Sequence, residues 1–271
     1  MAKTMTTIEH KAPETMSPAK GFAIPQQDQL PVFTPNAATL ERNHIVGFNS
    51  RNFTSRPFSL LRSQLIKRMR ANGYKILGIT SPAPGAGKSF LSANIAASMS
   101  RLPSIKTLAF DLDVRRASLA ANFGLSAKFG LEQFLAGATD DLTKVGCSVA
   151  GTNLSLFPCF NNDLDSMDLL AGDRFGAFVD ALKKLPDDMI VIFDMPPVFA
   201  NDDAMVVASM IDAYVMVVEQ GRTSARQVKD SMRLLEPAKC IGSVLNRYEG
   251  GVGEGIGLGA YEKYNDYYQN G

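Results

Sequence analysis

The chain of 271 residues has few of the residue types on which metalloenzymes and disulfide-rich proteins depend. It has no tryptophan, and its only two histidines, His10 and His44, precede the expected core. Its three cysteines, Cys147, Cys159 and Cys240, show neither metal-ligand spacing nor an even-numbered framework. We therefore expect small buried thiols in a reducing compartment, and neither a histidine-based metal or catalytic site nor a disulfide scaffold.

Excess charge of one sign and long apolar runs are also absent. The 28 Lys and Arg residues nearly balance the 27 Asp and Glu residues, so the net charge is +1 and no bulk field attracts nucleic acid or anionic lipid. No run approaches the ~18 apolar residues of a membrane span. Residues 1–40 lack the apolar stretch of a secretory signal. We expect a cytoplasmic protein that does not bind nucleic acid and reaches a membrane only through a partner.

Composition divides the chain into three regions. Residues 1–50 are rich in Thr, Pro and Gln and show no sustained periodicity, which predicts a disordered extension. Residues 51–248 contain the alternating apolar patterns of a folded domain, with a helix expected from Ser55 onward. Residues 249–271 combine glycines with tyrosines and predict a flexible tail.

Strand and helix patterns alternate within the central region. Strands are expected at Ile76–Thr80, Thr107–Phe110, Leu154–Pro158, Met189–Phe193, Ala213–Val218 and Cys240–Leu245. Helices are expected at Ser89–Arg101, Leu131–Leu135, Met167–Leu185, Asp203–Met210 and Ser224–Leu235. Because several strands are continuous apolar runs, both of their faces should be covered by helices. The alternation predicts a doubly wound, mostly parallel α/β sheet of the P-loop NTPase type.

A phosphate-binding loop follows the first of these strands. Residues 81–89 read S-P-A-P-G-A-G-K-S, so Pro82 replaces the first glycine of the G-x-x-x-x-G-K-[ST] pattern. In such loops the backbone N–H groups and the lysine bind phosphate oxygens, the hydroxyl ligates Mg²⁺, and the following helix adds its positive end. The candidate nucleotide-binding residues here are Gly85, Ala86, Gly87, Lys88, Ser89 and Phe90.

Carboxylates follow two of the later strands. Asp111 and Asp113 come after the second strand, and Asp194 ends the strand at 189–193. An isolated Asp at a strand end is often a turn or cap residue. Beside a phosphate loop, carboxylates at this edge favour a magnesium site. Arg115 or Arg116 would neutralise phosphate charge or pair with one of the aspartates.

Taken in order, these motifs resemble those of the bacterial tyrosine autokinases (BY-kinases) of capsule and exopolysaccharide synthesis. The resemblance is carried by residues 83–89 (A-P-G-A-G-K-S), 111–116 (D-L-D-V-R-R), 194–198 (D-M-P-P-V), 203–204 (D-A) and 242–246 (G-S-V-L-N). It implies ATP and Mg²⁺ as cofactors. By the same resemblance Lys88 and Ser89 bind phosphate and Mg²⁺, while Asp113 and Asp194 position the ion.

By the same resemblance, Asp111 would orient an attacking phenol or accept its proton. From its position after these aspartates, Arg115 is a further candidate nucleotide-binding residue. Asn246 matches an adenine-contacting position of related ATPases, although an asparagine there is equally expected simply to end a strand.

The tail supplies candidate phosphate acceptors. Four of the seven tyrosines lie within residues 261–268, after a glycine-rich segment that would let them reach an active site. From composition alone, an aromatic tail that packs against the core or a partner is the simpler interpretation. In the family, however, the autophosphorylation sites form a C-terminal tyrosine cluster, which here consists of Tyr261, Tyr264, Tyr267 and Tyr268.

One family element is altered. Members carry an E-x-x-R-x-x-R sequence before the phosphate loop that joins subunits into a ring, and the corresponding positions here are Arg56, Ser59 and Arg62. Only Arg62 matches, so a different or weaker homo-oligomer is expected. The resemblance implies a stand-alone kinase subunit at the inner face of the cell membrane. Its activator would be a membrane chain-length-control (co-polymerase) protein.

Two other functions compete with this hypothesis. A partitioning or positioning ATPase would carry a second lysine five residues before Lys88, but Ala83 occupies that position. A nucleotide-gated scaffold without enzymatic activity would fit the altered ring element. The retained Lys88, Ser89 and three aspartates argue for chemistry instead.

Overall fold

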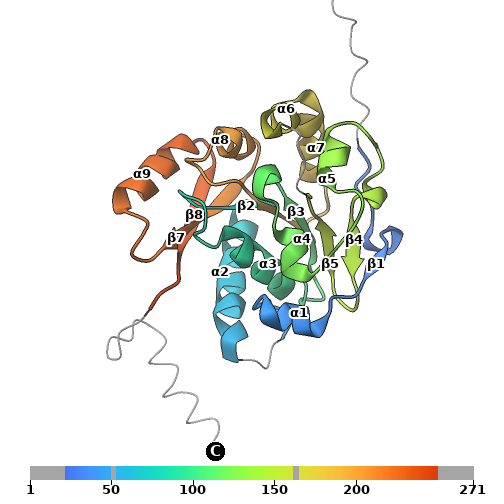
Figure 1. Cartoon of the computed structure of the whole chain (residues 1–271), viewed down its shortest axis with the longest axis horizontal. Coiled ribbons are helices and arrows are strands. Elements are labelled where there is room, and N and C mark those ends of the chain that lie inside the picture. Colours follow the sequence, from blue (N-terminus) through green and yellow to red (C-terminus); the bar gives the residue numbers. More distant parts are fainter. Residues whose placement is uncertain (1–21, 50–52, 161–164, 250–271) are drawn as a thin grey trace, which may run out of the picture.

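The computed structural model describes residues 22–49, 53–160 and 165–249, which form a single sheet between two layers of helices (Figure 1). The sheet has eight strands in the order β1-β4-β5-β3-β6-β2-β7-β8. Paired strands run parallel, except for β4 and β5, which are antiparallel. The predicted doubly wound, mostly parallel sheet is therefore confirmed.

The strands are β1 (Val32–Phe33), β2 (Ile76–Thr80), β3 (Lys106–Asp111), β4 (Cys147–Val149), β5 (Leu154–Phe157), β6 (Met189–Asp194), β7 (Ala213–Glu219) and β8 (Lys239–Asn246). The α-helices are α1 (Ala37–Arg42), α2 (Arg56–Asn72), α3 (Lys88–Met99), α4 (Leu119–Phe123), α5 (Leu131–Leu135), α6 (Ser166–Leu170), α7 (Asp173–Lys183), α8 (Asp203–Ala208) and α9 (Ala225–Leu234). Short 3₁₀ turns occupy η1 (Gln27–Gln29), η2 (Phe53–Ser55), η3 (Val114–Arg116) and η4 (Leu142–Lys144).

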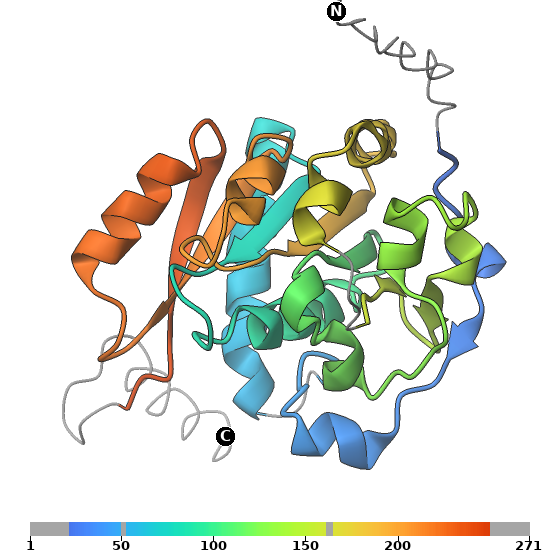
Figure 2. The same cartoon turned by 45° about the horizontal axis from the view of Figure 1, so that its top comes forward.

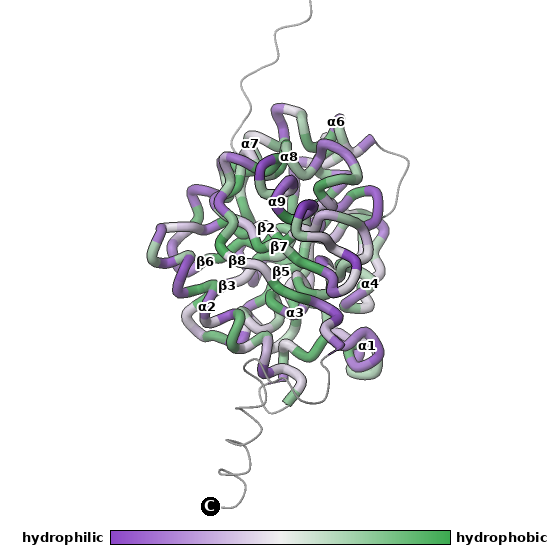
Figure 3. The backbone as a smooth tube through the Cα atoms, turned by 90° about the vertical axis from the view of Figure 1, so that its left-hand side faces the viewer, coloured by the Kyte–Doolittle hydropathy of each residue, from purple (hydrophilic) through white to green (hydrophobic). Residues whose placement is uncertain are grey.

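Two separate groups of apolar side chains pack the two faces of the sheet. One contains residues of α5, α6, α7 and α8, and α9 adds Val228 at its margin. The other contains residues of α2, α3 and α4. In Figures 1 and 2 the helices of these groups lie on opposite sides of the strands, and Figure 3 shows apolar residues concentrated along the strands. Helices on both faces explain why β2 and β6 are buried along their whole length.

The strand register brings the predicted site residues to one edge. Asp111 and Asp194 are paired positions at the carboxyl ends of β3 and β6. Ile79, at the end of β2, is in turn paired with Asp194. The phosphate loop after β2 therefore begins next to both carboxylates, as expected for a ligand site at this edge of a parallel sheet.

The expected disordered extension is wrong for residues 22–49. These residues form η1, β1 and α1, and β1 adds a parallel edge strand beside β4. Asn36 caps α1 by accepting hydrogen bonds from the backbone N–H groups of Ala38 and Thr39. β1 has two residues and its partner β4 has three, so both strands are too short to show a periodic pattern in the sequence. Neither strand was predicted.

Two further differences concern helices. The single helix expected over residues 167–185 is divided into α6 and α7, because the chain turns at Ala171 and Gly172 and α7 begins after Gly172. The five-residue helix α4 was not expected. The helix expected from Ser55 is confirmed as α2, with Pro57 in its first turn and Gly73 ending it in a left-handed conformation.

Candidate nucleotide site

The loop after β2 forms an open cradle beside α3. Gly85 and Gly87 have φ values of 86° and 94°, a conformation that residues with a Cβ rarely adopt. The loop is tied to the segment after β6, because Val198 N donates to Ser81 O (2.9 Å) and Phe199 N donates to Pro82 O (3.0 Å). The first turn of α3 starts at Lys88, so its unpaired N–H groups face the cradle.

A cavity of about 260 Å³ lies at this cradle. Its lining residues are Pro84, Gly85, Gly87, Lys88, Ser89, Phe90, Asp113, Arg116, Ser118 and Asn122. Six of these belong to the phosphate loop or the first turn of α3, and the other four come from the segment between β3 and the end of α4. The pocket thus contains most of the predicted nucleotide-binding residues.

Lys88 is the cationic centre of the site. Its Nζ lies 2.6 Å from Asp113 Oδ2 and 3.8 Å from Asp194 Oδ1, and it donates to Ser89 Oγ at 3.1 Å. Burial lowers the pKa of the ammonium, but Asp194 and Asp113 outweigh burial, so the pKa of Lys88 is raised. The side chain is therefore held charged although only 7% of the residue is exposed.

Asp111 is fully buried behind this centre. Its Oδ2 accepts hydrogen bonds from Ser118 N (3.0 Å) and Leu119 N (2.9 Å), and its Oδ1 accepts one from Asp113 N (3.2 Å). Burial and the neighbouring Asp194 raise the pKa of Asp111 well above its usual range. Asp111 therefore anchors the turn that follows β3, a task that the sequence did not reveal.

One carboxylate oxygen of the site lacks a partner, as expected if the site holds a magnesium–triphosphate complex. Asp194 Oδ1 accepts a hydrogen bond from Ser92 Oγ (3.1 Å), but its Oδ2 is buried without a hydrogen-bond partner among the described residues. Burial raises the pKa of Asp194 despite the opposing effect of Lys88. No cluster of three His, Cys, Asp or Glu ligands is found in the described part of the chain. Mg²⁺ suits this arrangement, because it usually binds one or two carboxylates together with substrate phosphates and water.

Two other predicted residues support the loop. Asn246, the last residue of β8, donates from Nδ2 to Ala86 O (2.8 Å), so it braces the phosphate loop and does more than end a strand. The ring of Phe90 packs edge-on against Phe58 of α2, with centroids 5.8 Å apart. Asn122, which the sequence did not single out, donates to Ser89 O at 3.2 Å and lines the cavity. It lies on α4, the helix that the sequence did not predict.

Arg115 lies outside this pocket. Its Nε donates to Ser166 Oγ at 2.8 Å, whereas Arg116 lines the cavity. Of the two arginines considered from the sequence, Arg116 is thus the one placed beside the phosphate loop. The candidate acceptors Tyr261, Tyr264, Tyr267 and Tyr268 lie outside the described residues.

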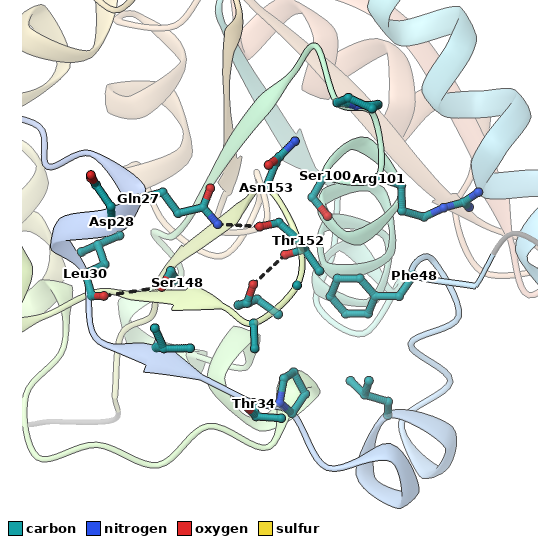
Figure 4. A pocket seen from close by; sticks show the side chains of 17 residues that line it. Gln27, Asp28, Leu30, Thr34, Phe48, Ser100, Arg101, Ser148, Thr152 and Asn153 are labelled. Atoms are coloured by element: carbon teal, nitrogen blue, oxygen red, sulfur yellow. Dashed lines mark hydrogen bonds between the residues drawn. The ribbon is translucent and has the colours of Figure 1, made fainter.

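A larger cavity, of about 1120 Å³, is at a different place (Figure 4). It lies between η1 and the β4–β5 hairpin and is lined by Ser100 and Arg101 just after α3. Lys88 is at the opposite end of this 12-residue helix, roughly 18 Å away at 1.5 Å per residue. Size alone would therefore have located the nucleotide site wrongly.

Other expectations concern the surface and the thiols. Cys147 and Cys159 are buried, as predicted, and Cys240 is partly buried. Burial raises the pKa of Cys147 to about 11, consistent with an unreactive thiol. Within the described ranges, no helix combines the length and apolar character needed to cross a bilayer.

Comparison with known proteins agrees with this geometry. The model of the CobQ/CobB/MinD/ParA nucleotide-binding domain family matches residues 77–264. The tyrosine-protein kinase CpsD of Streptococcus pneumoniae is 31% identical over 196 residues, which cover 71% of this chain and 83% of CpsD. The chain belongs to the bacterial tyrosine kinase family.

Other bacterial tyrosine kinases extend the comparison. CpsD of Streptococcus agalactiae is 29% identical over 213 residues, which cover 78% of this chain and 90% of that protein. The kinase domain of the Escherichia coli tyrosine kinase ETK superposes with a TM-score of 0.66 at 26% identity, covering 78% of this chain and 84% of that domain. The resemblance noted in the sequence is therefore confirmed.

Proposed function

We propose that this protein is an ATP-dependent protein-tyrosine autokinase that phosphorylates Tyr261, Tyr264, Tyr267 and Tyr268 of its own tail. The observation that carries the proposal is the placement of Lys88 between Asp113 and Asp194 at the mouth of a glycine-rich phosphate loop. Kinship with proteins named as tyrosine-protein kinases supports phenol oxygen as the acceptor.

The chain's residues divide the work of phosphoryl transfer. The N–H groups from Gly85 to Ser89 bind phosphate oxygens, and Lys88 neutralises charge on the β- and γ-phosphates. With a triphosphate bound, Lys88 would contact phosphate oxygens in place of Asp113, and Asp113 would be able to hold the ion. Ser89, Asp113 and Asp194 would hold Mg²⁺, which supplies positive charge to the phosphate oxygens when bound. The orphaned Asp194 Oδ2 would then acquire a partner through the ion or its waters.

Asp111 is proposed to orient the attacking phenol. Its Oδ1 accepts only one hydrogen bond, at 3.2 Å, whereas Oδ2 accepts two shorter ones, so Oδ1 has the freer lone pair. A raised carboxyl pKa also lies closer to neutral pH, where a proton acceptor works best. Because phosphoryl transfer proceeds largely through a loose transition state, this orientation matters more than early proton removal.

The biological setting is proposed from the family. Tail phosphorylation would regulate polymerisation and export of an exopolysaccharide or capsule. The activator would be a membrane chain-length-control protein that brings the kinase to the inner face of the membrane, where the chain would also associate with copies of itself. In the altered ring element, Arg62 Nη1 donates to Ser98 O of the same chain (3.0 Å), so this arginine is already engaged within the subunit.

The test is phosphosite mapping by mass spectrometry after incubation of the full chain with Mg-ATP, with and without the cytoplasmic tail of a candidate activator. We expect phosphate on the tail tyrosines of the wild type and at least ~10³-fold less on Lys88→Met, because the substitution removes the cation that contacts the phosphates. ATP hydrolysis without tyrosine phosphate would instead indicate a positioning-type ATPase. ATP binding without either reaction would indicate a scaffold.

A further inference from the structure

Arg115 is held at the rim of the site by helices of the α6–α8 side. Its Nε donates to Ser166 Oγ (2.8 Å) and lies 4.0 Å from Asp203 Oδ2, and its Nη2 lies 3.5 Å from Asp165 Oδ1. Arg116 is the next residue of η3 but lines the nucleotide pocket beside α3 and α4. Arg115 therefore lies on the α6–α8 side of the sheet edge, whereas Arg116 lies on the α3–α4 side.

A buried carboxylate fixes the position of Arg115. Asp203 is 2% exposed and accepts hydrogen bonds from Ser166 Oγ (2.6 Å) and from Asn201 Nδ2. Ser166 is itself fully buried, so it cannot turn to another partner without leaving this acceptor unsatisfied. A buried carboxylate also needs a nearby cation, which here is Arg115. Asp203 and Ser166 thus hold the Nε edge of the guanidinium in one place.

The outer edge of the guanidinium is available for binding. The Arg115 side chain is 57% exposed, and no described residue forms a hydrogen bond or ion pair with its Nη1. Asp165, at 58% exposure and 3.5 Å, makes a surface contact of the kind that contributes little. A positioned guanidinium with a free edge is well suited to bind a carboxylate with two parallel hydrogen bonds.

The tail supplies carboxylates next to its tyrosines. Glu262 follows Tyr261, and Asp266 precedes Tyr267. In the proposed reaction the nucleotide fills the pocket on the α3–α4 side, and the attacking oxygen must approach the γ-phosphate in line, from beyond it. Arg115 directly precedes Arg116, which lines this pocket, so a segment bound at Arg115 would lie beside the pocket on its α6–α8 side.

We propose that Arg115 is a specificity-determining residue that binds Glu262 or Asp266 of the tail and so places the neighbouring tyrosine for phosphorylation. Asp203, acting through Ser166, is its positioning residue, and the tail carboxylate displaces Asp165. This inference rests on the proposed function and names the feature by which the site selects its acceptor. It assigns Arg115 to acceptor recognition in place of the nucleotide role that the sequence suggested.

A double-mutant cycle in the full chain tests the proposal. The variants are Arg115→Gln, a tail variant combining Glu262→Gln and Asp266→Asn, and the combination of all three changes. Initial rates of tail phosphorylation and the KM for ATP are measured under conditions in which the wild type modifies its tail. Arg226→Gln is the matched control, because Arg226 is also an exposed arginine beside an aspartate, Asp230, on α9.

We expect about a tenfold lower rate for Arg115→Gln, a similar loss for the tail variant, and no further loss beyond twofold in the combination, with the KM for ATP unchanged within twofold. The control should match the wild type. Three results would overturn the inference and leave the kinase proposal intact. The losses of the Arg115 and tail variants could multiply in the combination, or the rate of Arg115→Gln could equal that of the wild type. The third result is a KM for ATP that rises by the same factor by which the rate falls. Absence of tyrosine phosphate on the wild type would overturn both.

Discussion

Two clusters of buried carboxylates lie at the same edge of the sheet, and each faces one cation. Around Lys88, three aspartates surround an ammonium that is almost enclosed, and Asp194 Oδ2 lacks a partner. Around Arg115, the single buried carboxylate is Asp203. Its Oδ2 accepts two hydrogen bonds, its Oδ1 has no partner among the described residues, and the cation is half exposed. Three buried carboxylates thus face one cation in the first cluster, whereas one buried carboxylate faces one cation in the second.

This difference separates groups kept for chemistry from groups kept for positioning. The raised pKa values of Asp111 and Asp194 mean that folding disfavours their charged forms, so the Lys88 cluster costs stability until a ligand binds. The Arg115 cluster gives the Ser166 hydroxyl and the Asn201 Nδ2 group an acceptor, Asp203 Oδ2, and should contribute stability. Substitutions in the two clusters should therefore change the free energy of unfolding in opposite directions.

Among the aspartate substitutions, the largest effect is expected for Asp113→Asn. This change removes the shortest ion pair of Lys88 and a proposed ion ligand, so the rate of tail phosphorylation should fall by about 10²-fold, the effect of removing one preorganised electrostatic group. Asp180→Asn is the matched control, since Asp180 also faces a lysine, Lys183, but at 4.0 Å on the exposed side of α7. Initial rates at saturating Mg-ATP provide the measurement. Equal rates for the two variants would remove Asp113 from the mechanism.

Asp203→Ala should have an intermediate effect, on stability. The change leaves the buried Ser166 hydroxyl and the Asn201 amide without their acceptor, which should lower the free energy of unfolding by about 2 kcal/mol. Asp202→Ala is its control, because Asp202 precedes α8 without a side-chain capping bond and is exposed. Urea denaturation compares the two. A loss no larger than that of the control would show that the Arg115 cluster does not stabilise the fold.

The smallest effect is expected for Asp194→Asn, with the opposite sign. A carboxyl whose folded pKa is raised stabilises the fold at pH values below its unfolded pKa, and this contribution is lost as the pH rises through the folded pKa. At neutral pH the charged form of Asp194 therefore destabilises the fold, and asparagine removes this destabilisation. In metal- and nucleotide-free buffer, Tm at neutral pH should rise by about 3 °C, and the gain should shrink as the pH falls toward 4. A lower Tm for the variant at neutral pH would contradict the comparison.

The parts of the molecule that the sequence predicted are those with strong local patterns. The five buried residues of β2, the glycines of the phosphate loop and the polar ends of β3 and β6 leave clear signals, and all were placed correctly. Asn246 was located at the end of the last strand, although its bond to Ala86 depends on how β8 meets the loop.

The remaining parts depend on contacts between distant segments. β1 pairs with β4, more than a hundred residues away, so no local pattern marks it. Asn122 enters the site because α4 packs beside α3, and Arg115 leaves the site because Ser166 and Asp203 hold it from another layer. The D-x-D-x-R spacing alone does not determine on which face of the sheet the arginine side chain lies.

The proposed kinase activity requires the Lys88 cluster to transfer phosphate from ATP to tyrosines of the tail. The most direct test is the intact mass of the full chain before and after incubation with Mg-ATP and the activator tail, followed by treatment with a tyrosine-specific phosphatase. We expect up to four added phosphates on the wild type, all removed by the phosphatase, and none on Lys88→Met. An unchanged mass for the wild type, or equal phosphate on both proteins, would contradict it.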